Sequence, residues 1–229
     1  MNKSIVLLSG GLDSATTLYQ AQSRGYNCHA LIFDYGQRHR KEIRCAIAIA
    51  RRAKVPYEVV TISLPWKGSA LLDKKMALPK NRSLIATNIP ITYVPARNII
   101  FLSFAASYAE AVGAQAIFIG ANAIDYSGYP DCRPKFFKAL AEALNRGMKS
   151  GVQGRRLKIE TPLVHLSKAQ IVRLAIKLGV PLNLTWSCYS GGKKPCGVCD
   201  SCRLREKGFA EFGVGDPIKV AWGGVFIAS

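Results

Sequence analysis

The sequence predicts an α/β fold in which a parallel five-stranded sheet is flanked by helices and followed by a small cysteine-rich segment. One observation is that short apolar runs alternate with segments whose apolar residues recur at helical spacing. Another is that 229 residues with 49% apolar content suffice for one substantial core. The alternation favours right-handed crossovers between parallel strands. The expected strands are 5–8, 27–33, 56–62, 116–119 and 158–160.

Charge and hydropathy restrict the class of protein. The chain carries 32 basic and 14 acidic residues, and this net charge of +18 suits an anionic ligand, a nucleic acid or a generally basic surface. The basic residues are spread in groups along the chain, so charge alone leaves these options open. Met1 leads directly into a strand, and no apolar run approaches the roughly 18 residues of a membrane span. We therefore expect a soluble, cytoplasmic protein.

A glycine turn, Ser9–Ser14, follows the first apolar run and opens a helix expected over 15–22. Gly10 and Gly11 leave room for a phosphate beside the free N–H groups of the helix start. The turn lacks the lysine and hydroxyl of a Walker loop, and a carboxylate at Asp13 beside phosphates implies an intervening Mg²⁺. The alternative is a plain connection in which Asp13 or Ser14 caps the helix. The motif resembles the pyrophosphate loop of the ATP pyrophosphatases, which implies an adenine nucleotide alpha hydrolase-like, Rossmann-like fold that cleaves ATP between its α- and β-phosphates.

Asp34 lies just past the second strand. Ligands of parallel sheets bind at the carboxyl ends of strands, so we expect Asp34 to meet the ribose or adenine of ATP, although an acidic residue also commonly begins a turn. Helical spacing then covers 39–53. The segment 63–93 shows no periodicity, and a loop of this length predicts a lid or an oligomer contact.

Arg97 and Lys168 are both expected in the first turn of a helix, where a cation opposes the helix dipole. Arg97 precedes a helix expected over 99–112, so we expect it to contact an ATP phosphate or a substrate carboxylate rather than extend into solvent. Ser167 is expected to cap a helix over 168–178. The resemblance to the pyrophosphate-loop superfamily implies that Lys168 is a phosphate ligand, the alternative being a solvated surface lysine.

The loop 120–134 leaves the fourth strand and is dense in polar and aromatic residues. A small planar ligand could stack on Tyr129, while Asp125 or Asp131 pairs with ring N–H groups. A guanine-like heterocycle suits such a site because its amidine edge can bind a carboxylate at two points. A further helix is expected over 135–146.

Four of the seven cysteines lie close together near the C-terminal end: Cys188, Cys196, Cys199 and Cys202. Two-residue gaps let neighbouring sulfurs converge on one ion, and four thiolates close a tetrahedral Zn²⁺ shell that leaves no position for water. Such a zinc site is structural. An iron–sulfur cluster is the chemical alternative.

Several segments extend the resemblance from superfamily to family. The segments 37–39, 94–98, 129–132 and 186–188, together with the cysteine spacing, resemble the 7-cyano-7-deazaguanine synthase family. The resemblance implies a ligase of queuosine or archaeosine biosynthesis that uses ATP, Mg²⁺ and one structural Zn²⁺ per chain. It converts 7-carboxy-7-deazaguanine and ammonia to the nitrile by adenylating first the carboxylate and then the amide. The ATP-binding residues expected are Leu8, Ser9, Gly10, Gly11, Leu12, Asp13, Ser14 and Asp34, with Asp13, Arg97 and Lys168 as catalytic residues.

The chain divides, on this interpretation, into a nucleotide-binding domain over 1–183 and a zinc-binding segment over 184–229 packed on it. Residues 219–222 suit an edge strand or a dimer contact. We expect small-molecule partners, no membrane and no stable nucleic acid, with a homodimer left open. Two other functions compete: a pyrophosphate-loop enzyme that thiolates tRNA, and a zinc-stabilised nucleic-acid-binding module, which would leave Asp13 unexplained.

Overall fold

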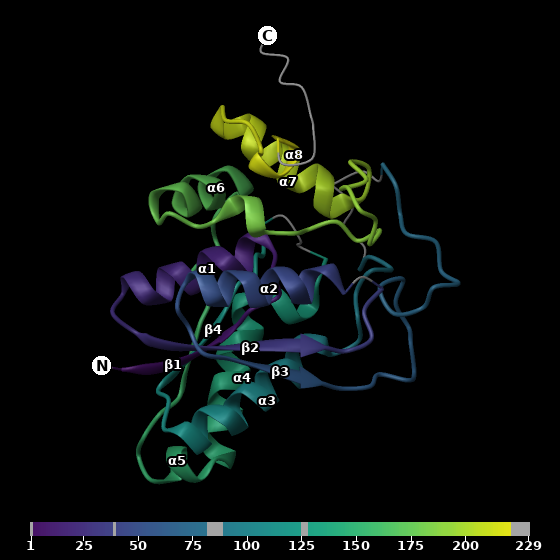
Figure 1. Ribbon diagram of the computed structural model, residues 1–229. Coiled ribbons are helices and arrows are strands. Elements are labelled where there is room, and N and C mark those ends of the chain that lie inside the picture. The colour runs from purple at the N-terminus through teal and green to yellow at the C-terminus, as the bar shows by residue number, and fades with distance from the viewer. Residues whose placement is uncertain (1, 39, 82–88, 125–127, 221–229) are drawn as a thin grey trace.

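The fold is a five-stranded parallel sheet between two layers of helices, as the computed structural model shows for residues 2–38, 40–81, 89–124 and 128–220 (Figure 1). The strand order is β3-β2-β1-β4-β5, and every neighbouring pair is parallel. The predicted fold class is therefore confirmed. The strands are β1 Lys3–Leu7, β2 Asn27–Asp34, β3 Tyr57–Thr61, β4 Ala116–Ile119 and β5 Lys158–Glu160.

Helices cover both faces of the sheet, and a second tier lies on one of them. Figure 1 shows α1, α2 and α6 on one side and α3, α4 and α5 on the other, with α7 and α8 stacked outside α6. The helices of the first side are α1 Leu12–Ser23, α2 Lys41–Arg52 and α6 Lys168–Lys177. Those of the second are α3 Arg97–Val112, α4 Pro134–Gly147 and α5 Lys149–Val152. The outer tier is α7 Asp200–Phe212 and α8 Pro217–Val220, and short 3₁₀ turns form η1 Pro130–Cys132 and η2 Leu182–Leu184.

Both faces of the central strands are buried, because successive side chains of a strand point to opposite sides. In β1, Val6 packs into the core beneath α1 and α6, whereas Ile5 and Leu7 pack into the core beneath α3. This burial explains why the strands read as continuous apolar runs. Among the described residues, no helix is both long and apolar enough to span a bilayer.

The strand order reverses between β1 and β4. The chain proceeds outward from β1 through β2 to β3, then crosses back so that β4 pairs with the other edge of β1. At such a switch point the connections leaving adjacent strands diverge and open a crevice at the carboxyl ends. The turns after Leu7 and Ile119 meet at this crevice.

One of two expectations about irregular segments changes, and the other stays untested. The segment 217–220 is helical, so the edge strand considered for residues 219–222 is wrong at 219–220, and 221–222 lie outside the described residues. The segment between β3 and α3 contributes to the core through Leu64, Leu71 and Val94. Its interpretation as a lid or an oligomer contact stays a prediction.

Candidate active site

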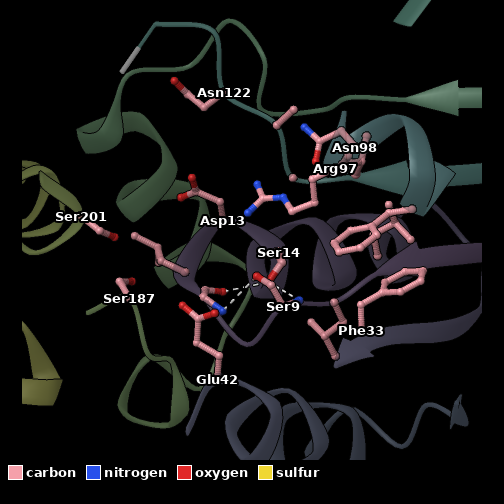
Figure 2. A pocket seen from close by; sticks show the side chains of 18 of the residues that line it. Ser9, Asp13, Ser14, Phe33, Glu42, Arg97, Asn98, Asn122, Ser187 and Ser201 are labelled. Atoms are coloured by element: carbon pink, nitrogen blue, oxygen red, sulfur yellow. Dashed lines mark hydrogen bonds between the residues drawn. The ribbon is translucent and has the colours of Figure 1, made fainter. Parts of the chain in front are cut away.

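A cavity of about 250 Å³ opens at the switch point (Figure 2). Its walls come from the carboxyl ends of β1, β2 and β4, the first turns of α1, α2, α3 and α6, and the cysteine-rich segment. Helix N-termini carry partial positive charge, so several of them around one cavity favour an anion such as a triphosphate. The lining residues expected from the sequence are Leu8, Ser9, Gly11, Leu12, Asp13, Ser14, Arg97, Tyr129 and Lys168.

The two glycines of the turn have different tasks. Gly10 adopts φ +85°, and a Cβ there would lie 2.2 Å from the backbone oxygen of Glu42 and 2.7 Å from the backbone nitrogen of Ala46. Gly10 therefore permits the turn to pack against α2, and it does not line the cavity. Gly11 does line the cavity, and the nearest atoms to its ideal Cβ are 3.6 Å away, so this glycine keeps the cavity side of the turn open.

The hydroxyl of Ser14 closes the turn from inside. It accepts hydrogen bonds from the backbone N–H of Ser9 at 3.1 Å and the Ser9 hydroxyl at 3.0 Å, and it donates to the Gly11 oxygen at 3.2 Å. These bonds, drawn in part in Figure 2, hold the turn in one conformation. The helix starts at Leu12 rather than at the expected residue 15.

Lys168 and Asp13 form a close ion pair beside this turn. The Lys168 Nζ lies 2.9 Å and 2.8 Å from the two carboxylate oxygens of Asp13. The Lys168 side chain is 8% exposed and that of Asp13 is 24% exposed, so the ammonium is almost completely removed from water. A buried lysine is normally paired, because an isolated charge loses its hydration energy. The alternative of a solvated surface lysine is therefore excluded.

Arg97 occupies the first turn of α3 and faces the same space. Figure 2 shows the Arg97 side chain extending from α3 into the space beside Asp13. Arg97 Nη1 donates to the Tyr35 hydroxyl at 3.4 Å, and its guanidinium lies 5.9 Å from the Tyr35 ring centroid. Burial acts to lower the pKa of Arg97, but Tyr35, Tyr129 and Asp131 raise it above its ordinary value, so the guanidinium stays charged. It can therefore meet an anion in the cavity.

Of the predicted substrate residues that the structure describes, one lines the cavity and the other does not. Tyr129 lines the cavity, and its hydroxyl lies 2.8 Å from the Thr92 hydroxyl. Asp131 lies behind the wall: its carboxylate accepts the backbone N–H of Asn98 at 3.2 Å in the first turn of α3. Asp125 lies outside the described residues. Burial raises the pKa of Asp131, which is consistent with its place in the interior.

Asp34 does not line the cavity. Its Oδ1 accepts the backbone N–H of Gly36 at 3.4 Å, and its Oδ2 lies 3.6 Å from Arg40. The cavity wall at this strand end is aromatic instead, because Phe33 stacks on Phe101 with ring centroids 4.0 Å apart. A flat heterocycle could pack on this wall.

The cysteine-rich segment closes the cavity. The Trp186 backbone N–H donates to the Gly10 oxygen at 2.8 Å, and Ser187 and Ser201 both line the cavity. Arg205 of α7 also lines it and makes a buried ion pair with Asp216 at 2.7 Å and 2.9 Å. The bond from Trp186 to Gly10 joins the C-terminal segment directly to the glycine turn.

The four cysteines converge as their spacing predicted. The Sγ atoms of Cys188, Cys196, Cys199 and Cys202 all lie within 4.8 Å of one another. Sulfur atoms bound to one Zn²⁺ at about 2.3 Å would be about 3.8 Å apart, so small movements would complete such a shell. Backbone N–H groups of Ser190 and Cys196 donate to the Cys188 Sγ at 3.4 Å and 3.3 Å. Hydrogen bonds from Cys199 and Cys202 lower the pKa of Cys188, and the same contacts with Cys188 raise the pKa values of Cys199 and Cys202. The cluster can therefore hold a metal ion.

Fold and site together define a protein of the pyrophosphate-loop class: the glycine turn lies at the switch point of a parallel sheet, with cationic side chains around the cavity that it borders. The family can also be assigned. Residues 3–213 match the family described as "Queuosine biosynthesis protein QueC", and the chain belongs to that family. The resemblance inferred from the sequence is confirmed.

Similar proteins agree with this assignment. The chain is 54% identical over 224 residues to the 7-cyano-7-deazaguanine synthase of Nostoc sp., covering 96% of this chain and 98% of that protein. It is 52% identical to the synthase of Thermoplasma volcanium, covering 95% of this chain and 90% of that protein. A structure from Methanocaldococcus jannaschii, described as a "predicted subunit of tRNA methyltransferase", has a TM-score of 0.50 at 17% identity, covering 77% of this chain and 75% of that chain, and shows the fold alone.

Several cavity residues escaped the sequence reasoning. Asn98, Ser187 and Ser201 lie next to Arg97, Cys188 and Cys202, which the motifs did single out. The sequence signal that could have identified these three residues is that each is a polar residue beside a metal ligand or a helix start. Glu42 also lines the cavity, but no sequence signal identified it, because its position depends on how α2 packs against the glycine turn.

Proposed function

We propose that this chain converts 7-carboxy-7-deazaguanine and ammonia to 7-cyano-7-deazaguanine at the expense of ATP. One structural observation carries the proposal: the glycine turn, the Asp13–Lys168 pair and Arg97 face a single cavity. The chain is also 54% identical to a protein named 7-cyano-7-deazaguanine synthase. Membership of the QueC family supports the same activity.

The chemistry explains the residues. Hydroxide is a poor leaving group, so the substrate carboxylate first takes AMP from ATP, and ammonia then displaces AMP to give an amide. A second adenylation allows the amide oxygen to leave as AMP, and loss of the amide protons gives the nitrile. Gly11 and the start of α1 bind the departing pyrophosphate, while Arg97 and Lys168 stabilise charge at phosphorus. A preorganised cation acts strongly where water is excluded, and the Lys168 side chain is only 8% exposed.

Asp13 is the residue that would hold Mg²⁺. Its carboxylate is the part of the Asp13–Lys168 pair that remains partly exposed, at 24% for the side chain, and it borders the cavity. A carboxylate oxygen is a ligand that Mg²⁺ accepts, and the ion would offset the phosphate charge. The lysine ammonium keeps the carboxylate in place before ATP binds.

The heterocycle is assigned to the aromatic side of the cavity. Phe33, Tyr35 and Phe101 supply apolar ring surface, and Tyr129 also lines the cavity. Asp125 stays a proposed partner for ring N–H groups. Asp131 is better assigned to holding Asn98, because its carboxylate is already bonded to α3. Asp34 stays a proposed ribose ligand that would have to act from outside the cavity lining.

No nucleophilic side chain is required. Cys132 lines the cavity, but burial and the neighbouring Asp131 raise its pKa to about 12, so the thiol stays protonated. A protonated thiol is a poor nucleophile. Direct attack of the substrate oxygen on ATP is therefore the pathway that the cavity supports.

The experiment is mass spectrometry of the product after incubation with ATP, Mg²⁺, ammonium and 7-carboxy-7-deazaguanine. We expect the nitrile, with formation dependent on ATP. Binding of tRNA with a steep salt dependence, together with absence of the nitrile, would instead favour a tRNA-modifying enzyme or a nucleic-acid-binding module. The cytoplasmic location, the boundary at residue 184 and a homodimer stay predictions from the sequence.

We further propose that the four cysteines hold one structural Zn²⁺. Metal analysis of the purified protein should find one zinc per chain and no colour, since Zn²⁺ has no visible absorption bands. The closed set of four thiolates leaves no position for a reacting water. Broad visible absorption that bleaches on reduction would assign an iron–sulfur cluster in its place.

A further inference from the structure

A glycine in the middle of α7 lies against the residue that reaches Asp13. Gly208 is inside the helix Asp200–Phe212, and its backbone is not in the left-handed conformation that favours glycine. An interior glycine costs a helix about 1 kcal/mol relative to alanine. Packing rather than backbone conformation therefore accounts for this residue.

The packing partner is the base of the Lys168 side chain. A Cβ at position 208 would lie 2.4 Å from Lys168 Cγ, 2.9 Å from its Cβ and 3.0 Å from its backbone carbonyl carbon. These atoms belong to the root of the side chain and to the backbone, so rotating the flexible end of the lysine would not relieve the contact. A methyl group at position 208 would have to move the lysine stem or separate α7 from α6.

The close contact between Gly208 and Lys168 determines the direction in which the lysine side chain extends. The backbone of α7 covers the stem of Lys168, which is 6% exposed, and the ammonium emerges at Asp13, 155 residues away in sequence. A lysine in the first turn of a helix would otherwise extend into solvent, where the ammonium is hydrated and the dipole does not oppose it. The absent side chain at position 208 removes the steric obstacle to the buried course.

We infer that Gly208 is a positioning residue, which acts through Lys168 on the binding and reaction of ATP. The inference deepens the proposed function and rests on it for the role of Lys168. It also gives α7, which begins at the cysteine cluster, a direct part in the phosphate site. The heterocycle side of the cavity, around Phe33 and Tyr129, lies outside this contact.

The test compares Gly208→Ala with Gly147→Ala as a matched control. Gly147 is the last residue of α4, has no positive φ, and has no atom within 4 Å of its ideal Cβ. Binding of ATP is followed by the intrinsic tryptophan fluorescence, to which Trp186 in the cavity lining contributes, and turnover by nitrile formation. We expect Gly208→Ala to raise the Kd of ATP and to lower kcat/KM for ATP at least tenfold, while KM for the heterocycle stays within twofold. Gly147→Ala should match the unsubstituted protein.

A double-mutant cycle separates positioning from general damage. In a Lys168→Ala background, which removes the Cγ at 2.4 Å, Gly208→Ala should change ATP binding by less than twofold. An equal loss in both backgrounds would overturn the inference, as would a folded, metal-loaded Gly208→Ala protein with unchanged ATP parameters. If Gly208→Ala alone is insoluble, a double variant with Lys168→Gly, which removes both the Cγ at 2.4 Å and the Cβ at 2.9 Å, should recover solubility, and its failure to do so also counts against the inference. ATP binding is measured without product, so absence of the nitrile in every variant would refute the proposed function alone.

Discussion

Replacing Asp13 by Asn should lower kcat by at least about a hundredfold, the size expected for losing one preorganised charge contact in an active site. The amide keeps the shape of the side chain but cannot hold Mg²⁺ by charge, and it removes the carboxylate that pairs with the Lys168 ammonium. Removing one partner of a buried ion pair typically costs about 3–5 kcal/mol. Asp13 is partly exposed, so we expect a loss of stability near or below the lower end of that range.

The measurement is kcat at saturating ATP together with the thermal midpoint of unfolding. Glu142→Gln is the matched control, because this exposed carboxylate on α4 also pairs with cations, Arg146 and Arg156, away from the cavity. Exposed pairs contribute about 0.2–1 kcal/mol, so the control should keep both activity and midpoint nearly unchanged. An Asp13→Asn protein with near-native turnover at ordinary Mg²⁺ would remove Asp13 from the catalytic site.

Cys199→Ser should have the largest effect on stability. Its thiolate is one of the four that converge, and Cys199 also immediately precedes α7, so its loss frees the start of the helix that packs on Lys168. Closed metal sites contribute folding free energy directly. We expect the thermal midpoint to fall on the order of 10 °C, since each kcal/mol shifts the midpoint of a chain of this size by about 2–4 °C.

The comparison is with Cys28→Ala, which changes a buried cysteine outside the cluster. Midpoint, soluble yield, metal content and activity per folded molecule are measured for both variants. The cluster variant should lose yield and metal far more than it loses activity in the fraction that remains folded. A well-folded, metal-loaded Cys199→Ser protein without activity would instead show that this thiolate takes part in the reaction.

Local patterns were sufficient for most of the architecture. The five strands were predicted within two residues of their observed ends. The central strands β1, β2 and β4 are apolar runs buried on both faces, whereas the edge strands β3 and β5 are only partly buried. Ser167 was correctly predicted as a helix cap: its hydroxyl accepts the Gln170 backbone N–H, and its own backbone N–H donates to the Gln170 side-chain oxygen. Both signals lie within a few residues of the structure that they specify.

The cysteine cluster was also accessible from the sequence. Two-residue spacing brings neighbouring sulfurs to one point whatever the rest of the chain does, and the three cysteines at 196, 199 and 202 follow this rule. The fourth cysteine, Cys188, reaches the other three because only a short loop separates it from Cys196. The family resemblance depended on these same compact motifs, and the match over residues 3–213 confirms it.

The tertiary structure alone decided which candidate residues meet. Asp13 and Lys168 were identified separately, and only the stacking of α7 on α6 and of α6 on α1 turns them into a pair. Packing also gave different positions to residues that looked equivalent in sequence. Gly11 borders the cavity, whereas Gly10 contacts α2. Tyr129 also borders the cavity, whereas the Asp131 carboxylate accepts a hydrogen bond from the first turn of α3. The physical reason is the distance along the chain over which each interaction acts. Backbone conformation and metal-ligand spacing are set by neighbours along the chain, whereas the direction of a buried side chain depends on the helix packed over it, as Gly208 of α7 lies over Lys168.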